Sequence, residues 1–427
     1  MWGSQAWPLA GDREQRVRIL QVNKFYDPRG GTERVLYDLE DGLRERGHEV
    51  GIFAGQHAAN RHCAGPSWFV PERDYESPGL RERIDHAIAT LYNHNARRHF
   101  AQALDEFAPD LVHLHNIYHQ FSPSILDELH DRRLPAVMTV HDFKLVCPVY
   151  RLFRDGELCE ECVGRDWPLG VVRHRCSRGS AAESLLLAVE ASWHRRRSSY
   201  ARALDAFIAP GTFMQEKLIE GDLPADRVVL CRNALRDVPA AADANVRSTR
   251  PTFLFAGRLS PEKGVDLLVD AARECPQIDL RIAGAGPDES LLREHATGCP
   301  NIVFLGHLDA ATLQAERERS WATLVPSRWY ENAPLSVIES WWAGRPVLGS
   351  GHGGLAEMLA DGQAGWSVEP ERAAWVSALQ RAATAAEELD RLGRKARDRA
   401  ASRHGFDLFL DRTLEIYDAA LDTEAVQ

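Results

Sequence analysis

Residues 256–272 read AGRLSPEKGVDLLVDAA, and residues 329–340 read WYENAPLSVIES. The first segment starts at the end of an apolar run and continues with apolar residues at helical spacing, which is typical of a strand, a loop and a helix in an α/β domain. It places Arg258 and Lys263 in the loop. Two cations ahead of a helix favour a bound diphosphate, because the first turn of a helix also offers unpaired backbone N–H groups.

The second segment carries two carboxylates, Glu331 and Glu339, with seven residues between them. They lie on either side of the start of a helix predicted near Leu335. A carboxylate only accepts hydrogen bonds, so a pair of them suits the hydroxyl groups of a sugar. The two segments together predict a site for a nucleoside diphosphate that carries a sugar.

Short apolar runs alternate with helical patterns in both halves of the chain, which predicts parallel sheets covered by helices on both faces. The expected fold class is α/β, with two doubly wound, Rossmann-like domains. In the first half, strands are expected at 17–22, 49–54, 111–115, 136–141, 206–209 and 228–232. In the second half, strands are expected at 252–256, 279–283, 302–305, 323–326, 346–349 and 365–368.

The domain organisation follows from a break in this alternation. Residues 237–250 are rich in alanine, proline and charge without a hydrophobic period, and they are predicted to form a linker. The first domain is expected at 1–236, with a Cys-rich insert at about 143–180, and the second at 251–404. Residues 405–427 are predicted to form a C-terminal helix.

With these cations and this Glu-x7-Glu pair, the chain resembles the retaining glycosyltransferases of family 4, over roughly residues 17–369. That family has the GT-B fold, in which two domains face each other across a cleft. The resemblance implies that Arg258 and Lys263 bind the donor phosphates, and that Glu331 and Glu339 hold the sugar and the ribose. It also implies that the donor binds mainly to the second domain and the acceptor to the first, and that the C-terminal helix crosses back to the first domain.

The first predicted strand leads into Gly30 and Gly31, after which Thr32 is expected to cap a helix that begins near Glu33. Glycine lets the backbone approach a ligand closely. The glycines are adjacent and do not form the dinucleotide fingerprint G-x-G-x-x-G, so a plain strand–helix turn is an alternative. The resemblance implies that the backbone N–H groups of Gly30 and Gly31 contact the donor phosphate. Glu33 matches the glutamate that follows this turn in the family.

The segment LVHLHN places His113 and His115 on the same face of a predicted strand. Such a pair could bind a metal, although no third ligand is evident nearby. The alternative is one buried and one loop histidine. The resemblance implies that His115 lies near the 6-position of the sugar at the transfer site. His141 and Asp142, at the end of the next strand, are candidates on the acceptor side.

Further turns of the second domain are candidates for donor contacts. Asn332, Ala333 and Pro334 are expected to form a tight turn whose backbone N–H groups hold phosphate where the helix begins near Leu335. Gly286, in the glycine turn IAGAGP, would line the pocket of the nucleotide base through its backbone. A plain turn is the alternative for Gly286.

Four of the eight cysteines, Cys147, Cys159, Cys162 and Cys176, follow the spacing C-x11-C-x2-C-x13-C in one loop-like region. Four thiolates would form a tetrahedral structural zinc site. Only one C-x2-C pair is present, which leaves an iron–sulfur cluster, a redox pair and free thiols as alternatives. No cofactor is expected for catalysis, because the two loop cations would stabilise the leaving diphosphate.

Residues 165–202 contain eight arginines and three carboxylates, a local charge of +5 in a chain whose net charge is −11. The stretch includes apolar residues such as Trp193, followed by Arg195, Arg196 and Arg197. A basic amphipathic helix can lie on an anionic membrane surface. The alternative is a solvated basic face on a packed helix.

Composition limits the class of protein further. The 427 residues are 44% hydrophobic and 26% charged, which suits a folded protein with buried cores. The net charge of −11 argues against a general nucleic-acid binder. The sequence lacks a run of about 18 apolar residues, and residues 1–16 lack an apolar signal core. We therefore expect a cytoplasmic protein, peripheral on the inner face of the membrane if the basic helix docks there.

The sequence thus predicts a metal-independent, hexosyltransferase-like retaining glycosyltransferase. It would move a sugar from a nucleotide-diphosphate sugar to a hydroxyl acceptor, which could be a glycan, a lipid-linked sugar or a small molecule. The expected context is polysaccharide, glycolipid or glycoconjugate biosynthesis. A nucleotide-sugar epimerase of the same fold and a non-catalytic sugar-nucleotide-binding protein are the alternatives. A dehydrogenase is disfavoured by the missing dinucleotide fingerprint.

Overall fold

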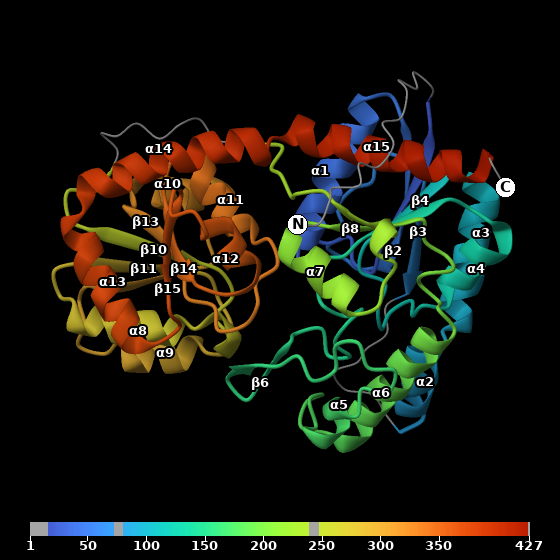
Figure 1. Ribbon diagram of the computed structural model, residues 1–427, viewed down its shortest axis with the longest axis horizontal. Coiled ribbons are helices and arrows are strands. Elements are labelled where there is room, and N and C mark those ends of the chain that lie inside the picture. Colours follow the sequence, from blue (N-terminus) through green and yellow to red (C-terminus); the bar gives the residue numbers. More distant parts are fainter. Residues whose placement is uncertain (1–15, 72–79, 239–246, 426–427) are drawn as a thin grey trace. The chain divides into compact units, whose positions relative to one another are not determined.

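The computed structural model describes residues 16–71, 80–238 and 247–425, which form two units with one large parallel sheet each (Figure 1). The first unit comprises Met1–Tyr150, Glu160–Cys231 and Asp407–Gln427, and the second comprises Arg151–Cys159 and Arg232–Phe406. Most of the predicted linker, residues 239–246, lies outside the described residues.

The first unit is built on a seven-stranded parallel sheet with the order β3-β2-β1-β4-β5-β8-β9. Its strands are β1 (Arg18–Asn23), β2 (Glu49–Gln56), β3 (Ser67–Pro71), β4 (Leu111–Leu114), β5 (Ala136–Thr139), β8 (Ala206–Ala209) and β9 (Val228–Leu230). Strand β1 pairs with both β2 and β4, so the order of the strands reverses between β1 and β4. Ligands of doubly wound sheets bind beyond the carboxyl ends of the strands at such a switch point.

The segments around these strands form helices because the apolar residues of these segments recur at helical spacing. They are α1 (Gly31–Glu45), α2 (Leu80–Leu91), α3 (His94–Phe107), α4 (Ile125–Arg132), α5 (Gly170–Arg173), α6 (Ala181–Arg196), α7 (Thr212–Glu220), the 3-10 turn η1 (Ala225–Arg227) and α15 (Phe406–Ala425). In α1, Leu36, Leu39 and Leu43 form one buried stripe. Helix α15 packs on the first sheet, where the hydroxyl of Tyr417 lies 2.6 Å from Nδ1 of His113 on β4.

The second unit is built on a six-stranded parallel sheet with the order β12-β11-β10-β13-β14-β15. Its strands are β10 (Thr252–Ala256), β11 (Asp279–Ala283), β12 (Ile302–Gly306), β13 (Ala322–Val325), β14 (Val347–Ser350) and β15 (Gly365–Val368). Here the order reverses between β10 and β13, which pair directly. The loop with Arg258 and Lys263 follows β10 and the segment with Glu331 follows β13, so the topology brings them to one edge of the sheet.

The helices of the second unit cover both faces of its sheet. They are the 3-10 turn η3 (Pro261–Lys263), α8 (Val265–Glu274), α9 (Glu289–His295), α10 (Ala310–Arg319), α11 (Leu335–Trp342), α12 (Gly353–Leu359), α13 (Arg372–Thr384) and α14 (Ala386–Arg403). Leu348 of β14 packs in one core with Trp375 of α13, whereas its neighbour Val347 packs in another core with Trp341 of α11. Successive strand residues point to opposite faces, so these are the two sides of the sheet.

The surface helices have one buried and one exposed side. In α14, for example, Leu389 and Leu392 are buried while Arg391 and Arg394 are exposed. Along the described ranges, no helix combines the length and the apolar character that crossing a membrane requires.

The twelve strands expected from the sequence are all present, with ends within a few residues of the expected ones. Strand β3 is missed because its apolar run, Trp68–Val70, is only three residues long, lies at the edge of the sheet and is mostly partly exposed. The hairpin of β6 (Phe153–Arg154) and β7 (Glu157–Leu158) is missed because each strand is two residues long. The expectation that Thr32 caps α1 is wrong: Gly30 is the residue before the helix, and no side chain caps it.

Candidate functional site

The loop after β10 carries the two cations predicted from the sequence. The chain passes Arg258 and turns through η3, and Gly264 ends this turn with a left-handed φ of 66°. A Cβ atom on Gly264 would lie 2.2 Å from the carbonyl oxygen of Pro326, so glycine is required for this close approach. The approach holds Lys263 next to the chain that follows β13, where Glu331 lies.

Lys263 and Glu331 form an ion pair within the second unit. Nζ of Lys263 lies 2.7 Å from Oε1 of Glu331. The same oxygen accepts hydrogen bonds from the hydroxyl of Ser327 at 2.5 Å and from Nε1 of Trp329 at 2.9 Å. The ammonium also lies 5.0 Å from the centre of the Trp329 ring, within cation–π range. Three donors thus converge on Oε1, whereas Oε2 accepts no hydrogen bond from any residue in the described ranges.

Glu331 is ionised although it is only 7% exposed. Burial by itself would raise its pKa, but the charge of Lys263 and the three hydrogen bonds outweigh burial and hold the pKa below its ordinary value. At neutral pH the carboxylate therefore offers Oε2 as a charged acceptor. A hydroxyl group of a bound sugar is a matching donor.

Arg258 differs from Lys263 although both lie in the same loop. Its side chain is exposed, and it makes no ion pair or hydrogen bond with the part of the chain that the structure describes. The planar guanidinium can present two parallel N–H donors to phosphate oxygens. The loop therefore holds one cation that is fixed by a carboxylate and one that has no partner.

Glu339 lies on α11 and is held by a buried arginine of α10. Nη2 of Arg317 lies 2.6 Å from Oε2 of Glu339, while Oε1 of Glu339 accepts no hydrogen bond within the described ranges. Arg317 is 3% exposed; burial lowers its pKa, and the charge of Glu339 opposes that effect. A buried guanidinium depends on such a partner, so the pair fixes the position of Glu339.

Close backbone contacts shape the turn that follows Glu331. The backbone N–H of Gly354 donates to the carbonyl of Glu331 at 2.8 Å. A Cβ atom on Gly354 would lie 1.6 Å from the carbonyl oxygen of Asn332, so this contact also requires glycine. Nδ2 of Asn233 donates to the carbonyl of Ala333 at 3.2 Å. The turn is thus held by the chain after β14 and by the residues that open the second unit.

Helix α11 begins at Leu335, directly after Pro334, as predicted. Within the described ranges no side chain caps α11, and the N–H of Val337 donates to the carbonyl of Pro334 at 3.1 Å, so the N–H groups of Leu335 and Ser336 are the ones that a ligand could reach. Gly286 lies in the loop after β11, where a Cβ atom would lie 2.1 Å from the carbonyl oxygen of Leu259. The structure therefore packs the Gly286 loop against the residue that follows Arg258, and the role of Gly286 in a base pocket stays a prediction.

In the first unit, the glycine turn precedes α1. Gly30 and Gly31 are exposed, and within the described ranges no side chain makes a capping hydrogen bond to the helix start that they form. Glu33 in the first turn is buried, and burial raises its pKa although Nδ2 of Asn23 donates to its Oε1 at 3.1 Å. Glu33 therefore ties α1 to the end of β1, and the phosphate contact of the two glycines stays a prediction.

Three histidines stack at the ends of β4 and β5. The ring centres of His113 and His115 are 4.4 Å apart, and those of His115 and His141 are 5.1 Å apart. Nδ1 of His115 lies 2.8 Å from Nε2 of His141, and Nε2 of His115 lies 3.1 Å from Oε1 of Gln21. Because an amide oxygen only accepts, His115 carries its proton on Nε2 and accepts at Nδ1 from His141.

His115 is fully buried, and both of its ring nitrogens have partners in the first unit. Burial lowers the pKa of His115, and it lowers the pKa of His113 and of His141 to about 3. The three rings are therefore neutral at neutral pH. His141 is partly exposed, so it is the more accessible end of the row. The role near the sugar that the resemblance implies for His115 stays a prediction.

Asp142 follows His141 and is also partly exposed. Burial raises its pKa, while the charge of Lys24 and the backbone N–H of Lys144, at 2.9 Å, act in the opposite direction. A carboxyl group at the carboxyl end of β5 could accept a hydrogen bond from a hydroxyl group. The acceptor-side roles of His141 and Asp142 also stay predictions.

The four clustered cysteines differ in burial and in the unit to which they belong. Cys147 is buried, and Cys159, Cys162 and Cys176 are partly exposed. Cys159 belongs to the second unit and the other three belong to the first. Within the described ranges, no three His, Cys, Asp or Glu side chains are grouped as a metal site requires. This arrangement gives the zinc hypothesis no support. The zinc site stays a prediction, and elemental analysis of protein purified without chelator would test it.

Sequence reasoning missed Ser327, Trp329 and Arg317. Ser327 and Trp329 precede Glu331 by four and two residues, and their hydrogen bonds to its Oε1 depend on how the turn folds. A Trp and a Ser directly before a site carboxylate are a usable signal, because both are donors. Arg317 lies 22 residues before Glu339 on a charged helix, where the sequence gives no sign that it is buried.

Two family models match the chain in succession. The model described as Glycosyltransferase Family 4 matches residues 29–236, and the model described as Glycosyl transferases group 1 matches residues 240–399. The first match includes the glycine turn and the histidine row. The second includes both loop cations and both carboxylates of the second unit.

Individual proteins resemble the chain over nearly its whole length. Glycogen synthase of Mycobacterium tuberculosis is 27% identical over 418 residues, which cover 95% of each chain. The GDP-mannose-dependent alpha-mannosyltransferase of Mycolicibacterium smegmatis is 29% identical and covers 81% of this chain and 82% of its own. The structure of sucrose-phosphate synthase from Thermosynechococcus elongatus matches with a TM-score of 0.72 at 19% identity, over 96% of this chain and 100% of that one.

The structural likeness confirms the fold that the sequence predicts, GT-B with two doubly wound units. The two family models, which follow one another from residue 29 to residue 399, establish the activity class as transfer of a sugar. This chain is a glycosyltransferase of family 4 and belongs to the group with the GT-B fold.

Proposed function

We propose that this glycosyltransferase moves a sugar from a nucleoside diphosphate sugar to a hydroxyl acceptor with retention of the anomeric configuration. The observation that carries the proposal is the grouping of charges at the β10–β13 switch point. A free cation, a cation paired to a carboxylate and a second carboxylate gather there, namely Arg258, Lys263 with Glu331, and Glu339. Diphosphate and sugar hydroxyl groups are the complementary partners.

Each of these residues has hydrogen-bonding capacity left for a donor molecule. The ammonium of Lys263 has three N–H groups, of which Glu331 takes one, so the others can reach phosphate oxygens. Arg258 has its whole guanidinium available. Oε2 of Glu331 would accept from a hydroxyl of the sugar, and Oε1 of Glu339 would accept from a hydroxyl of the ribose.

In the proposed reaction, the bond between the anomeric carbon and the diphosphate breaks while the acceptor oxygen bonds to the same carbon. The acceptor attacks from the face that the diphosphate leaves, so the configuration is retained. The proton of the acceptor hydroxyl passes to the departing phosphate oxygen. Arg258 and Lys263 would stabilise the negative charge that builds on the diphosphate, and preorganised donors of this kind are often the largest contribution to the rate. The proposal assigns no step to a metal.

The nucleotide base, the sugar and the acceptor are not chosen by these residues. The names of the relatives point to more than one donor, since one is a glycogen synthase and another depends on GDP-mannose. A nucleotide-sugar epimerase and a non-catalytic binding protein are not favoured, because both family models describe sugar transferases. In the first unit, the proposal gives His115 a role near the 6-position of the sugar, the backbone of Gly30 and Gly31 a contact with the donor phosphate, and His141 and Asp142 acceptor-side roles.

A thermal-shift screen with UDP, GDP and ADP tests the donor site first. A ligand at about 100 times its Kd stabilises the folded state by about 2.7 kcal/mol, so one nucleotide should raise the melting temperature clearly. Arg258→Met should abolish that shift, whereas the matched surface variant Arg391→Met should keep it.

The preferred nucleotide is then supplied as glucose and mannose conjugates, with simple glycosides as acceptors. NMR of the product reports the anomeric configuration. An inverted product would overturn retention, and a protein that none of the three nucleotides stabilises would overturn the proposed donor site.

A further inference from the structure

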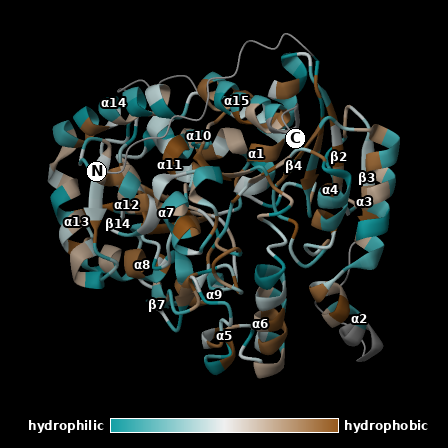
Figure 2. Ribbon diagram, turned by 45° about the vertical axis from the view of Figure 1, so that its right-hand side comes forward, coloured by the Kyte–Doolittle hydropathy of each residue, from teal (hydrophilic) through white to brown (hydrophobic). Residues whose placement is uncertain are grey.

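A surface of the first unit that takes no part in the proposed reaction exposes large apolar side chains. Trp167 and Leu169, just before α5, are 47% and 61% exposed. Leu185 and Trp193, both on α6, are each 51% exposed. Helices α5 and α6 pack against each other, and Figure 2 shows apolar segments on both. We call these four residues the apolar surface.

The end of α6 connects the members of the apolar surface. The guanidinium of Arg196, in the last turn of α6, lies 4.6 Å from the centre of the Trp167 ring. Leu185 lies three helical turns before Arg196 and therefore on the same side of α6. Trp193 lies two turns after Leu185, so Leu185 and Trp193 share one broad side of the helix. The loop before α5 and the exposed side of α6 therefore meet at Arg196.

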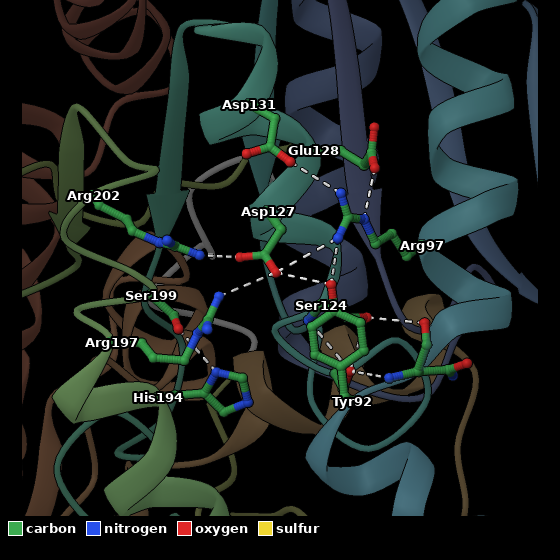
Figure 3. A network of polar contacts seen from close by, with 12 residues as sticks. Tyr92, Arg97, Ser124, Asp127, Glu128, Asp131, His194, Arg197, Ser199 and Arg202 are labelled. Atoms are coloured by element: carbon green, nitrogen blue, oxygen red, sulfur yellow. Dashed lines mark hydrogen bonds and ion pairs between the residues drawn. The ribbon is translucent and has the colours of Figure 1, made fainter.

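Two of the three consecutive arginines at the end of α6 are paired with carboxylates. Arg195 lies 3.1 Å from Asp166 and 2.5 Å from Asp222. Arg197 lies 3.6 Å from Asp127 on α4, in the network of Figure 3. These pairs connect the end of α6 to the rest of the unit. In the membrane hypothesis, Arg196 is therefore the one of these three arginines that carries no ion pair within the described residues.

Four other arginines of the same segment have no carboxylate partner in the described part of the chain. They are exposed and lie around α5 and at the end of α6: Arg165, Arg173, Arg175 and Arg196. None of them is therefore fixed in an ion pair within the described part of the unit. The surface combines exposed indole rings and leucines with unpaired guanidinium groups.

We propose that the apolar surface and these four arginines dock the protein on an anionic lipid bilayer. Tryptophan is enriched where a bilayer meets water, because its ring is apolar while its N–H needs a polar partner. Arginines at the surface of an anionic membrane are attracted to its headgroups. Charge complementarity selects this occupant over a neutral apolar partner, because the arginines would be left without counterions against a neutral face.

Cosedimentation with vesicles tests the proposal without using the transfer reaction, so its outcome is independent of the donor chemistry. The full chain should bind vesicles made of equal parts phosphatidylcholine and phosphatidylglycerol, and it should bind pure phosphatidylcholine vesicles far more weakly. Binding should weaken as salt is added, because salt screens surface charge. Absence of binding to the anionic vesicles, or binding that ignores both salt and lipid charge, would overturn the proposal.

Charge variants locate the surface. Each arginine near an anionic membrane contributes about fivefold in affinity, so Arg173→Gln with Arg175→Gln should weaken binding by about 25-fold. The control is Arg391→Gln with Arg394→Gln, which makes the same change of charge on the exposed side of α14 and should leave binding unchanged. Equal binding of the test and control pairs would overturn the assignment of the surface.

An apolar variant supplies the second arm of the test. Trp193→Ala removes a side chain that is half exposed, so the fold should remain, which circular dichroism checks. Binding to the anionic vesicles should fall severalfold, because the indole contributes apolar area at the interface. Unchanged binding would mean that charge alone attracts the protein and that no apolar contact forms, which contradicts the proposed docking.

Discussion

Neutralising Lys263 and neutralising Arg258 should affect the stability of the protein differently and its activity similarly. The sequence alone predicts that Lys263 and Arg258 both contribute little to folding, because both are loop charges. In the structure, Lys263 is the counterion of Glu331, which is more than nine-tenths buried, whereas Arg258 is exposed and unpaired. Lys263→Met should therefore destabilise the protein, and Arg258→Met should not.

The size of the effect follows from what remains around the carboxylate. After Lys263→Met, Glu331 keeps its hydrogen bonds from Ser327 and Trp329 and loses its countercharge. Breaking a buried ion pair costs about 3–5 kcal/mol, and the lower end applies because the side chain of Lys263 is 24% exposed. We expect about 3 kcal/mol less free energy of unfolding for Lys263→Met and less than about 0.5 kcal/mol for Arg258→Met. Each variant should lose transfer rate by about 100-fold or more.

The pH dependence gives the reasoning a second check. In the wild type, the pKa of Glu331 lies below 4.5, so its stabilising effect is complete above pH 4.5 and is lost as the pH falls through the lower, folded value. Without Lys263, burial is no longer offset by a countercharge, and the pKa of Glu331 should rise above its ordinary value. The variant then gains stability as the pH falls from neutral, so the gap to the wild type should narrow.

Urea unfolding at several pH values, with initial rates of nucleoside diphosphate release, measures both effects. Lys263→Met with Glu331→Gln is the matched double variant, since a neutral amide of the same shape needs no counterion. It should recover most of the lost stability and none of the activity. If Lys263→Met is as stable as the wild type, or if Arg258→Met is destabilised to the same extent, the assignment of the ion pair is refuted.

Three further variants or conditions probe single contacts. Trp329→Phe keeps a ring beside Lys263 and removes the N–H donor to Glu331, so donor KM should rise about tenfold and stability should fall by about 1 kcal/mol, as steady-state kinetics and urea unfolding report. Arg317→Met frees Glu339 and should weaken donor affinity in calorimetry, whereas neutralising the exposed arginine two residues later should not. The stability carried by the neutral, buried histidine row is complete above about pH 6.5 and should be lost as the pH falls toward 3, because the unfolded state binds protons first, and urea unfolding against pH measures this loss.

The strands could be predicted because each central strand of a parallel sheet is buried on both faces and therefore reads as a short apolar run. TFLFA at Thr252–Ala256 and AFIA at Ala206–Ala209 are buried almost throughout, and the sequence predicts the first and last residue of both strands correctly. The edge strand β3 gives a weaker signal, because its apolar run is three residues long and only one of them is buried. The other edge strands, β9, β12 and β15, were predicted, so it is the short apolar run of β3, and not its edge position alone, that hides it from the sequence.

The candidate site could be located from the sequence but not resolved in detail. The spacing of Glu331 and Glu339 placed both beside the start of α11, where the structure has them. The sequence could not distinguish a cation with a partner from one without, because pairing of Lys263 depends on the glycine that lets η3 approach the chain after β13. It also could not show that Arg317 is buried, since burial follows from the packing of α10 and not from the residues beside it.

Glu331 and Glu339 are each held through one carboxylate oxygen, but they differ in the number of donors and in burial. We therefore expect them to tolerate shortening to aspartate differently. Glu331 is fixed by three donors in a buried setting, so its free oxygen is oriented before any donor molecule binds. Glu331→Asp withdraws the carboxylate from all three donors and should lose about as much activity as Glu331→Gln. Glu339 has one partner and a side chain that is 33% exposed, so the shorter side chain of Glu339→Asp has room to adjust its position. Glu339→Asp should therefore keep most of the activity that Glu339→Gln loses. Initial rates of the four variants decide this, and equal losses for both aspartate variants would show that preorganisation of Glu331 has no special role.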